Sequence, residues 1–244
     1  MKSNLILSGG VGHEFAETSA YLAAMLKPLG VASTVTDDWT GWADDYDMVT
    51  VNGLRWRMRA DRYEPLRAAE AFATPWTLTE AITHHLARGG ALLVMHAAIV
   101  CMDDWPEWEA ICGGGWDWEQ SFSPAPGDVY CHVGRKAFTL TDVCYHLLRM
   151  HGEMEVVATG RVNWNRSVLT RPPAGISALG LHQPMAWIRT HGGGRVAVDV
   201  LGHDVRSLED PDHQLLLYHL VARLLRLPDA AEVTSPSALM SDFR

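Results

Sequence analysis

The feature that most constrains this fold is a regular alternation of short apolar runs and helical segments, joined at glycines. Four apolar runs of strand length occur in the first hundred residues, at 4–8, 31–35, 48–51 and 91–95. A helical segment that ends at Gly30 separates the first two runs, and another over 79–86 precedes the fourth. Because parallel strands need crossover helices, the pattern predicts an α/β fold with a mostly parallel central sheet and helices on both faces.

The second half of the chain is less regular but fits the same domain. We expect strands over 128–133 and 153–158, a long polar excursion over 163–180, and an amphipathic helix over 212–225. The chain has 244 residues, 48% of them hydrophobic, which is enough for one large core. We therefore predict a single domain over 1–227, followed by a loosely held tail over 228–244.

The segment 184–204 is the most informative one for function. A Pro-x-x-Trp strand leads to a glycine-rich hairpin, and a second apolar strand over 195–201 ends on Gly202-His203-Asp204. A titratable pair directly after a buried strand lies where α/β proteins place their chemistry. The alternative is that His203 and Asp204 only begin a loop, because a single histidine is often structural.

Three histidines follow predicted strands: His13, His96 and His203. The carboxyl ends of parallel strands meet at one edge of the sheet, so we expect these side chains to converge. Imidazoles titrate near neutrality and could perform general acid–base chemistry. They could also bind a divalent metal, alone or with Glu153 or Asp204, although no His-Glu-x-x-His spacing supports a metal. A structural role for some of them remains an alternative.

The glycine turn over 9–12 does not have the spacing of a dinucleotide-binding motif, and the chain contains no Walker sequence. We therefore predict no nucleotide cofactor. Backbone N–H groups at this turn, including that of Gly10, could still bind a carbonyl or carboxylate oxygen. The junction at His96-Ala97-Ala98 is similar to a nucleophile elbow, but its imidazole favours proton transfer or ligation over acyl-enzyme chemistry.

The chain contains ten tryptophans. Four of them lie within fourteen residues: Trp105, Trp108, Trp116 and Trp118. Indole rings bury a large area, so these residues could belong to the core. They could also form a pocket wall, since a flat indole face suits the C–H face of a sugar ring.

Composition excludes several classes of partner. The formal charge of −9 argues against nucleic acid or an anionic membrane surface as the main partner. No apolar run is long enough for a signal peptide or a membrane helix. The four cysteines form no Cys-x-x-Cys pair, so neither a structural zinc site nor a redox motif is indicated. We expect a reducing, cytoplasmic setting.

One basic segment stands apart from this acidic background. Arginines occupy positions 55, 57 and 59, and Arg62 follows shortly after. This segment is typical of a solvated face. The alternatives are a subunit contact, which would make a homodimer plausible, or an anion site.

Four segments, taken together and in this order, resemble the ThuA-like family, named for trehalose utilisation. They are 5–13 (LILSGGVGH), 89–98 (GGALLVMHAA), 105–114 (WPEWEAICGG) and 184–204, which contains Trp187 and Leu-Gly-His-Asp. The resemblance implies a flavodoxin-like three-layer sandwich of the class I glutamine-amidotransferase-like superfamily. His96 occupies the position of the amidotransferase cysteine, so we expect no glutaminase activity.

The resemblance also implies catabolism of disaccharides, through keto-sugar intermediates made by a partner sugar dehydrogenase. The reaction we expect is proton abstraction next to a carbonyl, leading to isomerisation or to glycosidic cleavage. His96 and His203 would be the acid–base pair or the ligands of zinc or manganese. Glu153 would be a second base or ligand, and Asp204 would orient His203. The substrate would contact Gly10, His13, Trp105, Trp108 and Trp187.

Two departures from the family pattern stand out. Family members usually have a histidine shortly after the Gly-Gly-aromatic stretch. The corresponding segment 116–123 contains no histidine. The family's Asp-Glu-Leu-Tyr element is matched to 152–155 (GEME), which retains an acid at Glu153 but has no tyrosine. Two further possibilities stay open: a non-catalytic carbohydrate-binding or regulatory protein, and a structural subunit of a sugar dehydrogenase.

Overall fold

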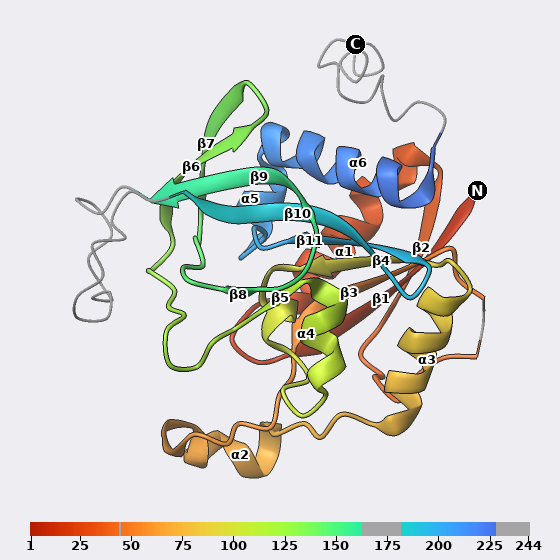
Figure 1. Cartoon of the computed structure of the whole chain (residues 1–244), viewed down its shortest axis with the longest axis vertical. Helices are drawn as coiled ribbons and strands as arrows, with labels where there is room; N and C mark the ends of the chain where they lie inside the picture. Colours follow the sequence, from red (N-terminus) through yellow and green to blue (C-terminus); the bar gives the residue numbers. More distant parts are fainter. Residues whose placement is uncertain (44, 163–181, 228–244) are drawn as a thin grey trace.

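A computed structural model describes residues 1–43, 45–162 and 182–227 of the chain. A nine-stranded sheet passes through its middle, in the order β2-β1-β3-β4-β11-β10-β9-β6-β7 (Figure 1). The first five strands in that order are parallel to one another. Their bounds are β2 Val31–Thr36, β1 Lys2–Gly10, β3 Met48–Leu54, β4 Ala91–Met95 and β11 Gly194–Asp199.

The other four strands extend the sheet in antiparallel fashion. They are β10 Gln183–His191, β9 Glu155–Val162, β6 Gly127–Val133 and β7 Lys136–Asp142. The switch occurs at the hairpin between β10 and β11, where Gly192 and Gly193 have φ angles of 58° and 98°. Glycine adopts this left-handed conformation without the steric cost of a Cβ, so it permits the tight reversal.

Helices cover both faces of the parallel part (Figure 1). On one face lie α1 Phe15–Met25, α5 Val205–Glu209 and α6 Pro211–Leu225; on the other lie α3 Trp76–Ala87 and α4 Pro106–Cys112. All five residues of β4 are buried, which is what a strand covered on both faces requires. This confirms the predicted α/β class, the flavodoxin-like architecture and most of the predicted strands.

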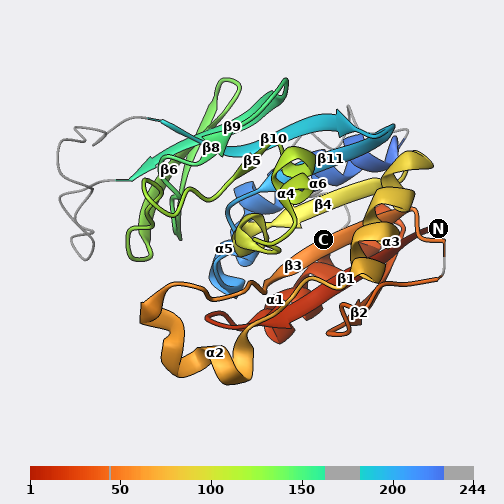
Figure 2. The same cartoon turned by 60° about the horizontal axis from the view of Figure 1, so that its bottom comes forward.

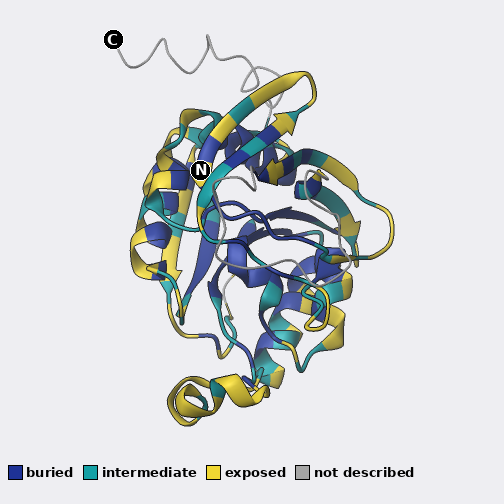
Figure 3. Cartoon of the chain, turned by 90° about the vertical axis from the view of Figure 1, so that its left-hand side faces the viewer, coloured by how far each residue is buried: buried dark blue, intermediate teal, exposed yellow. Residues whose placement is uncertain are grey.

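The remaining elements are short connections. The 3₁₀ helices are η1 Lys27–Leu29, η2 Asp61–Tyr63 and η3 His96–Val100, and a small second sheet pairs β5 Gly114–Gly115 with β8 Arg149–Met150. The helix α2 Glu64–Glu70 protrudes from the body and has no buried residue (Figures 2 and 3). Without an apolar stripe, α2 leaves no pattern for sequence analysis to detect.

Two further differences from the expected elements lie in the antiparallel part of the sheet. The strand β7 was not predicted, because it forms the edge of the sheet and most of its side chains are exposed. The strand expected at 153–158 begins two residues later and continues to Val162.

None of the helices in the described part of the chain combines the length and hydrophobicity that crossing a bilayer requires. The excursion expected at 163–180 and the tail at 228–244 lie outside the described residues.

Candidate functional site

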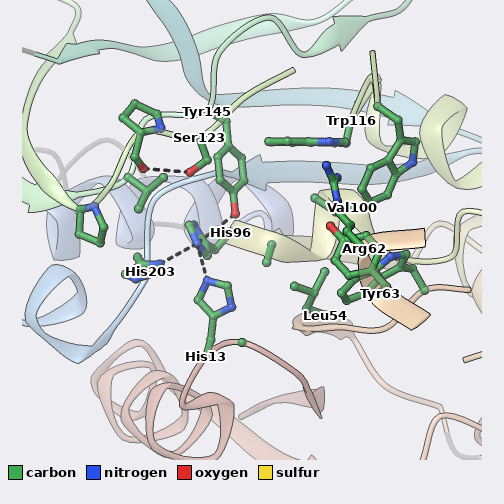
Figure 4. Close-up of a pocket in the computed structure, with 17 residues that line it drawn as sticks. His13, Leu54, Arg62, Tyr63, His96, Val100, Trp116, Ser123, Tyr145 and His203 are labelled. Atoms are coloured by element: carbon green, nitrogen blue, oxygen red, sulfur yellow. Dashed lines mark hydrogen bonds between the residues drawn. The ribbon is translucent and has the colours of Figure 1, made fainter. Parts of the chain in front are cut away.

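The structure brings together the three histidines that the sequence singled out (Figure 4). His13 lies in the turn between β1 and α1, His96 directly follows β4, and His203 lies between β11 and α5. One nitrogen from each ring lies within 4.8 Å of the others. The Nε2 atoms of His96 and His13 are 3.2 Å apart, and His203 Nδ1 is 3.3 Å from His96 Nε2. The parallel sheet edge therefore delivers the predicted convergence.

His96 is held in a strained backbone conformation. Its φ angle is 47°, in the left-handed region, and only 1% of the residue is exposed. Such a conformation costs roughly 1–3 kcal/mol in a non-glycine residue and persists only where the surroundings fix it. Behind the turn, the indole N–H of Trp108 donates to the carbonyl of Ala98 at 3.0 Å. The junction is thus an elbow that presents a single side chain, as the sequence suggested.

The tautomer of His96 follows from its partners. Its Nδ1 lies 2.8 Å from the carbonyl oxygen of Val200, which can only accept a hydrogen bond. Nδ1 therefore carries the proton, and the lone pair of Nε2 points toward His13 and His203. This is the orientation that a metal ligand or a general base needs.

Burial keeps two of the imidazoles neutral. Desolvation, with the proximity of His13 as a second cause, holds the pKa of His96 well below its ordinary value. Desolvation and the proximity of His203 lower the pKa of His13 to about 4. At neutral pH both rings therefore have a free lone pair, and the protons that would repel a cation are absent.

Tyr145 is a member of the site that the sequence analysis missed. Its ring stacks on His96, with centroids 5.0 Å apart, and its hydroxyl lies 3.1 Å from His96 Nε2. Burial raises the pKa of Tyr145, so the phenol stays protonated and donates this hydrogen bond. Trp116 meets the other side of the same ring edge-on, at 5.4 Å. The histidines thus have a neutral O–H donor beside them.

Asp142 fixes the two loops that carry Tyr145 and His203. Its buried carboxylate accepts hydrogen bonds from the backbone N–H groups of Val143 at 2.6 Å, Gly202 at 2.8 Å and His203 at 3.3 Å. The segment 142–145 reads Asp-Val-Cys-Tyr, with the acid and the tyrosine at the spacing of the family's Asp-Glu-Leu-Tyr element. This segment matches the element better than 152–155 does, because it has both the acid and the tyrosine.

A cavity of about 290 Å³ opens above the histidines. Aromatic rings form much of its wall: Trp56, Tyr63, Trp116, Trp118 and Tyr145. Its polar groups are few and sit at separate places, the three histidines at one end and Arg62 on the opposite wall (Figure 4). An apolar cavity with a small number of placed polar groups is typical of a small-molecule site.

The structure does not bring the three predicted substrate-binding tryptophans to this cavity. Trp108 and Trp187 are 2% and 0% exposed, and their indole N–H groups bond to backbone carbonyls of Ala98 and Cys112. Trp105 stacks on Trp108 and borders a neighbouring hollow instead. The indole rings of Trp108 and Trp187 therefore lie in the core, and that of Trp105 packs against it. Trp116 and Trp118 line the pocket instead.

The two predicted acidic residues also lie elsewhere. Glu153 is exposed and does not line the cavity. Asp204 caps α5: its carboxylate accepts from the backbone N–H of Arg206 at 2.9 Å and pairs with the Arg206 guanidinium. The backbone of His203 is fixed by Asp142 instead. Gly10 pairs with Leu54 within the sheet, and the neighbouring Gly12 lines the cavity in its place.

The three histidines could hold a metal ion. Tetrahedral ligands at 2.0–2.1 Å from zinc are about 3.3 Å apart, and two of the nitrogen separations here are 3.2 and 3.3 Å. The hydrogen bond from His96 Nδ1 to a backbone carbonyl is the support that metal-binding histidines commonly have. His13 joins the predicted pair of ligands, His96 and His203, as the cluster of three histidines in the sequence allowed.

Fold and site together define a class. The protein is a flavodoxin-like α/β protein in which a histidine stands at the strand-to-helix elbow, with two more histidines and a tyrosine around it. The sequence model of the ThuA family, described as trehalose utilisation, matches residues 4–221. The chain therefore belongs to the ThuA family, and that membership implies a role in sugar metabolism.

Solved structures share the fold at low sequence identity. A ThuA-like protein from Parabacteroides merdae has 15% identity and a TM-score of 0.66, with 88% of this chain and 87% of that chain covered. A ThuA-like protein from Bacteroides uniformis has 14% identity and a TM-score of 0.56, with 88% of each chain covered. A β-galactosidase from Rahnella sp. R3 has 13% identity and a TM-score of 0.56, over 93% of this chain and 31% of that one. No curated protein sequence matches the chain.

Proposed function

We propose that this protein is an enzyme of sugar catabolism that acts on a keto-sugar or a disaccharide-derived substrate. It abstracts a proton next to a carbonyl, and either isomerisation or glycosidic cleavage by elimination follows. The observation that carries the proposal is the convergence of three imidazole nitrogens within 4.8 Å of one another, at the end of an aromatic cavity.

The proton transfer needs a base and a group that stabilises the developing oxyanion. The electron pair of the broken C–H bond moves into the carbonyl, and in the elimination branch it then expels the glycosidic oxygen at the next carbon. The lone pair of His96 Nε2 faces the cavity and is fixed by Val200, so it is placed to take the proton. The hydroxyl of Tyr145 donates to His96 Nε2 at 3.1 Å in the free site. On substrate binding it would donate to the carbonyl oxygen instead, which releases the Nε2 lone pair for the proton transfer.

A metal-assisted version fits the same residues. His13, His96 and His203 would hold zinc or manganese, which, when bound, would polarise the substrate carbonyl as a Lewis acid. Tyr145 would then lose its acceptor on His96 and would be free to hydrogen-bond the substrate oxygen. Imidazole nitrogens suit both metals, with zinc the more tightly held of the two.

The first experiment determines the metal content. Protein purified without chelator or nickel resin is analysed by inductively coupled plasma mass spectrometry, beside His96→Ala and His203→Ala. His84→Ala is the matched control, because His84 is exposed on α3 and does not line the cavity. Near-stoichiometric zinc or manganese, lost in the two site variants alone, supports the metal-assisted version. Metal-free protein supports direct proton transfer to His96.

The second experiment tests the reaction class. Keto-disaccharides are incubated in D₂O, and exchange of the proton next to the carbonyl is followed by NMR. A positioned proton-transfer group contributes about 10²–10⁴-fold, so His96→Ala should lose at least that much exchange. Tight sugar binding without exchange in the wild type would refute catalysis and favour the non-catalytic carbohydrate-binding alternative.

The proposed setting follows from the substrate. A keto-sugar arises by oxidation of a hydroxyl, so we expect a sugar dehydrogenase as the metabolic partner. A cytoplasmic location agrees with the four cysteines, which are free and buried. Co-purification with an oxidoreductase and fractionation would test these two expectations, and light scattering would test a homodimer.

A further inference from the structure

One arginine of the basic segment at 55–62 lines the cavity, and the proposed function gives it no role. Arg57 pairs with Asp104 at 3.1 Å, and Arg67 downstream bonds to backbone carbonyls. Arg55 lies over the rings of Trp39 and Phe72. Arg62 is different, because it lines the cavity whose other end holds the histidines.

The guanidinium of Arg62 is held by aromatic rings and not by an acid. It lies 4.8 Å from the ring centroid of Tyr63 and 5.9 Å from that of Trp118. Within the described residues, no carboxylate lies within 4.0 Å of it. Stacking restricts the long side chain but leaves the N–H groups of the fork available. Arginine is therefore presented to the cavity as an oriented, unneutralised cation.

The charge on this wall constrains what can fill the cavity. None of the residues that line the cavity has a carboxylate side chain. Their ionisable side chains are the three histidines, two tyrosines and Arg62. Arg62 is exposed, and a ligand that fills the cavity would displace the part of its water on the cavity side. That partial desolvation costs free energy unless the ligand supplies acceptors. A carboxylate or a phosphate offers the planar or forked acceptors that a guanidinium binds best.

The neighbouring groove differs from the cavity because it contains a carboxylate. This groove shares Trp56, Arg62, Tyr63 and Trp118 with the cavity, and it adds Arg59 and Asp103. Asp103 Oδ1 accepts from the backbone N–H of Arg57 at 2.8 Å, so this carboxylate is already engaged. An anion in the groove would meet Asp103 as well as the two arginines, whereas in the cavity it would meet Arg62 with no carboxylate beside it.

We infer that Arg62 determines substrate specificity by binding an anionic group, a carboxylate or a phosphate, on the part of the sugar opposite the reacting carbonyl. This inference rests on the proposed function for the identity of the reacting end. It makes the substrate an acidic keto-sugar, held at one end by the histidines and at the other by an arginine. Trp116 and Trp118 would then contact the apolar face of the ring between them.

Binding without turnover tests this directly. Glucuronic acid, glucose 6-phosphate and methyl glucoside are titrated into the protein, and affinity is read from calorimetry and from tryptophan fluorescence. We expect at least one acidic sugar to bind about 10–100-fold more tightly than the neutral one, the range of a charge-assisted hydrogen-bonded pair. The carboxylate and phosphate arms tell which anion is bound.

The variants assign that preference to one residue. Arg62→Gln should abolish the preference for acidic sugars, and Arg62→Lys should retain part of it, because lysine keeps the charge but not the fork. Arg135→Gln is the matched control: Arg135 is exposed in the β6–β7 turn and its loss changes the net charge by the same amount. The control should bind as the wild type does.

Three results would overturn the inference: equal affinity for the neutral sugar, a preference that survives Arg62→Gln, or no binding of any of these hexoses. The proposed function fails separately. If acidic sugars bind in an Arg62-dependent manner but no keto-sugar exchanges its proton, only the catalytic proposal is refuted. If a neutral keto-sugar exchanges its proton and acidic sugars gain nothing, only the role of Arg62 is refuted.

Discussion

Replacing His213 with leucine tests whether a buried charge network builds this site. His213 is on α6 and is fully buried. Its Nε2 lies 3.1 Å from the carboxylate of Asp199, and its Nδ1 lies 2.8 Å from the carbonyl oxygen of Ser207. Both ring nitrogens face acceptors, so both carry protons and the imidazole is positively charged. The Ser207 hydroxyl in turn donates to Asp142, which holds the backbone of His203.

The magnitude follows from what the substitution leaves behind. Leucine fills a similar volume, but the carboxyl of Asp199, which is also 0% exposed, is left with the backbone N–H of Leu201 as its one hydrogen-bond partner among the described residues. Breaking a buried pair by removing one member costs about 3–5 kcal/mol. We expect a loss of that size in the free energy of unfolding, measured with urea. His219→Leu, on the same helix but only half-buried, should lose less than about 1 kcal/mol.

The raised pKa of His213 determines how the stability of the protein should change with pH. Burial lowers the pKa of His213, but Asp199, Asp142 and the Ser207 carbonyl together raise it by more, so the folded-state pKa lies above the ordinary value. The resulting stability is complete below the unfolded-state pKa of about 6.5 and is lost as pH rises through the folded-state pKa. Wild-type stability should therefore fall on the alkaline side, and His213→Leu should lack this slope. A destabilisation below about 1 kcal/mol, or an unchanged slope, would refute the charged network.

Three further predictions concern the cavity. Tyr145→Phe should keep the fold but lower keto-sugar turnover by about 10–100-fold, because one hydrogen bond to the developing oxyanion is lost; unchanged kcat would contradict this role. Burial depresses the pKa of His96 and that of His13, the latter to about 4. The free energy of unfolding should therefore decline as pH falls from 7 toward 4, and urea titrations of His96→Ala should show a weaker decline. Trp118→Ala should weaken sugar binding with little change in stability, whereas Trp108→Ala should lower the unfolding free energy by about 3–5 kcal/mol; calorimetry and urea titration separate these two results.

The parallel half of the sheet could be predicted from the sequence because its strands are buried on both faces. The run at 91–95 is apolar at every position, and it coincides with β4 residue for residue. The antiparallel half carries a weaker pattern, since β7 is an exposed edge and α2 has no apolar stripe. Periodicity reports burial, so elements without a buried face escape it.

The site divides in the same way. His13, His96 and His203 were found because each follows a predicted strand, and topology alone brings such positions together. Asp142 is the last residue of β7 and Tyr145 follows it, and the pattern did not reveal this strand, so their convergence on the histidines could not be derived. The missing signal was in the sequence, since Asp-Val-Cys-Tyr has the spacing of the family element that we placed at 152–155.

The elbow explains why a histidine here gives a different chemistry from a cysteine or serine. A strained turn aims one side chain out of the sheet edge, and a thiol or hydroxyl there would serve as a nucleophile. The imidazole of His96 has a second nitrogen, and Val200 engages it. The residue is thereby fixed in two places, at its backbone and at its ring, and only the Nε2 lone pair remains for chemistry. This imidazole lies close to two more imidazoles and a phenol. It is therefore suited to accept a proton or bind a cation, and neither role requires a covalent intermediate.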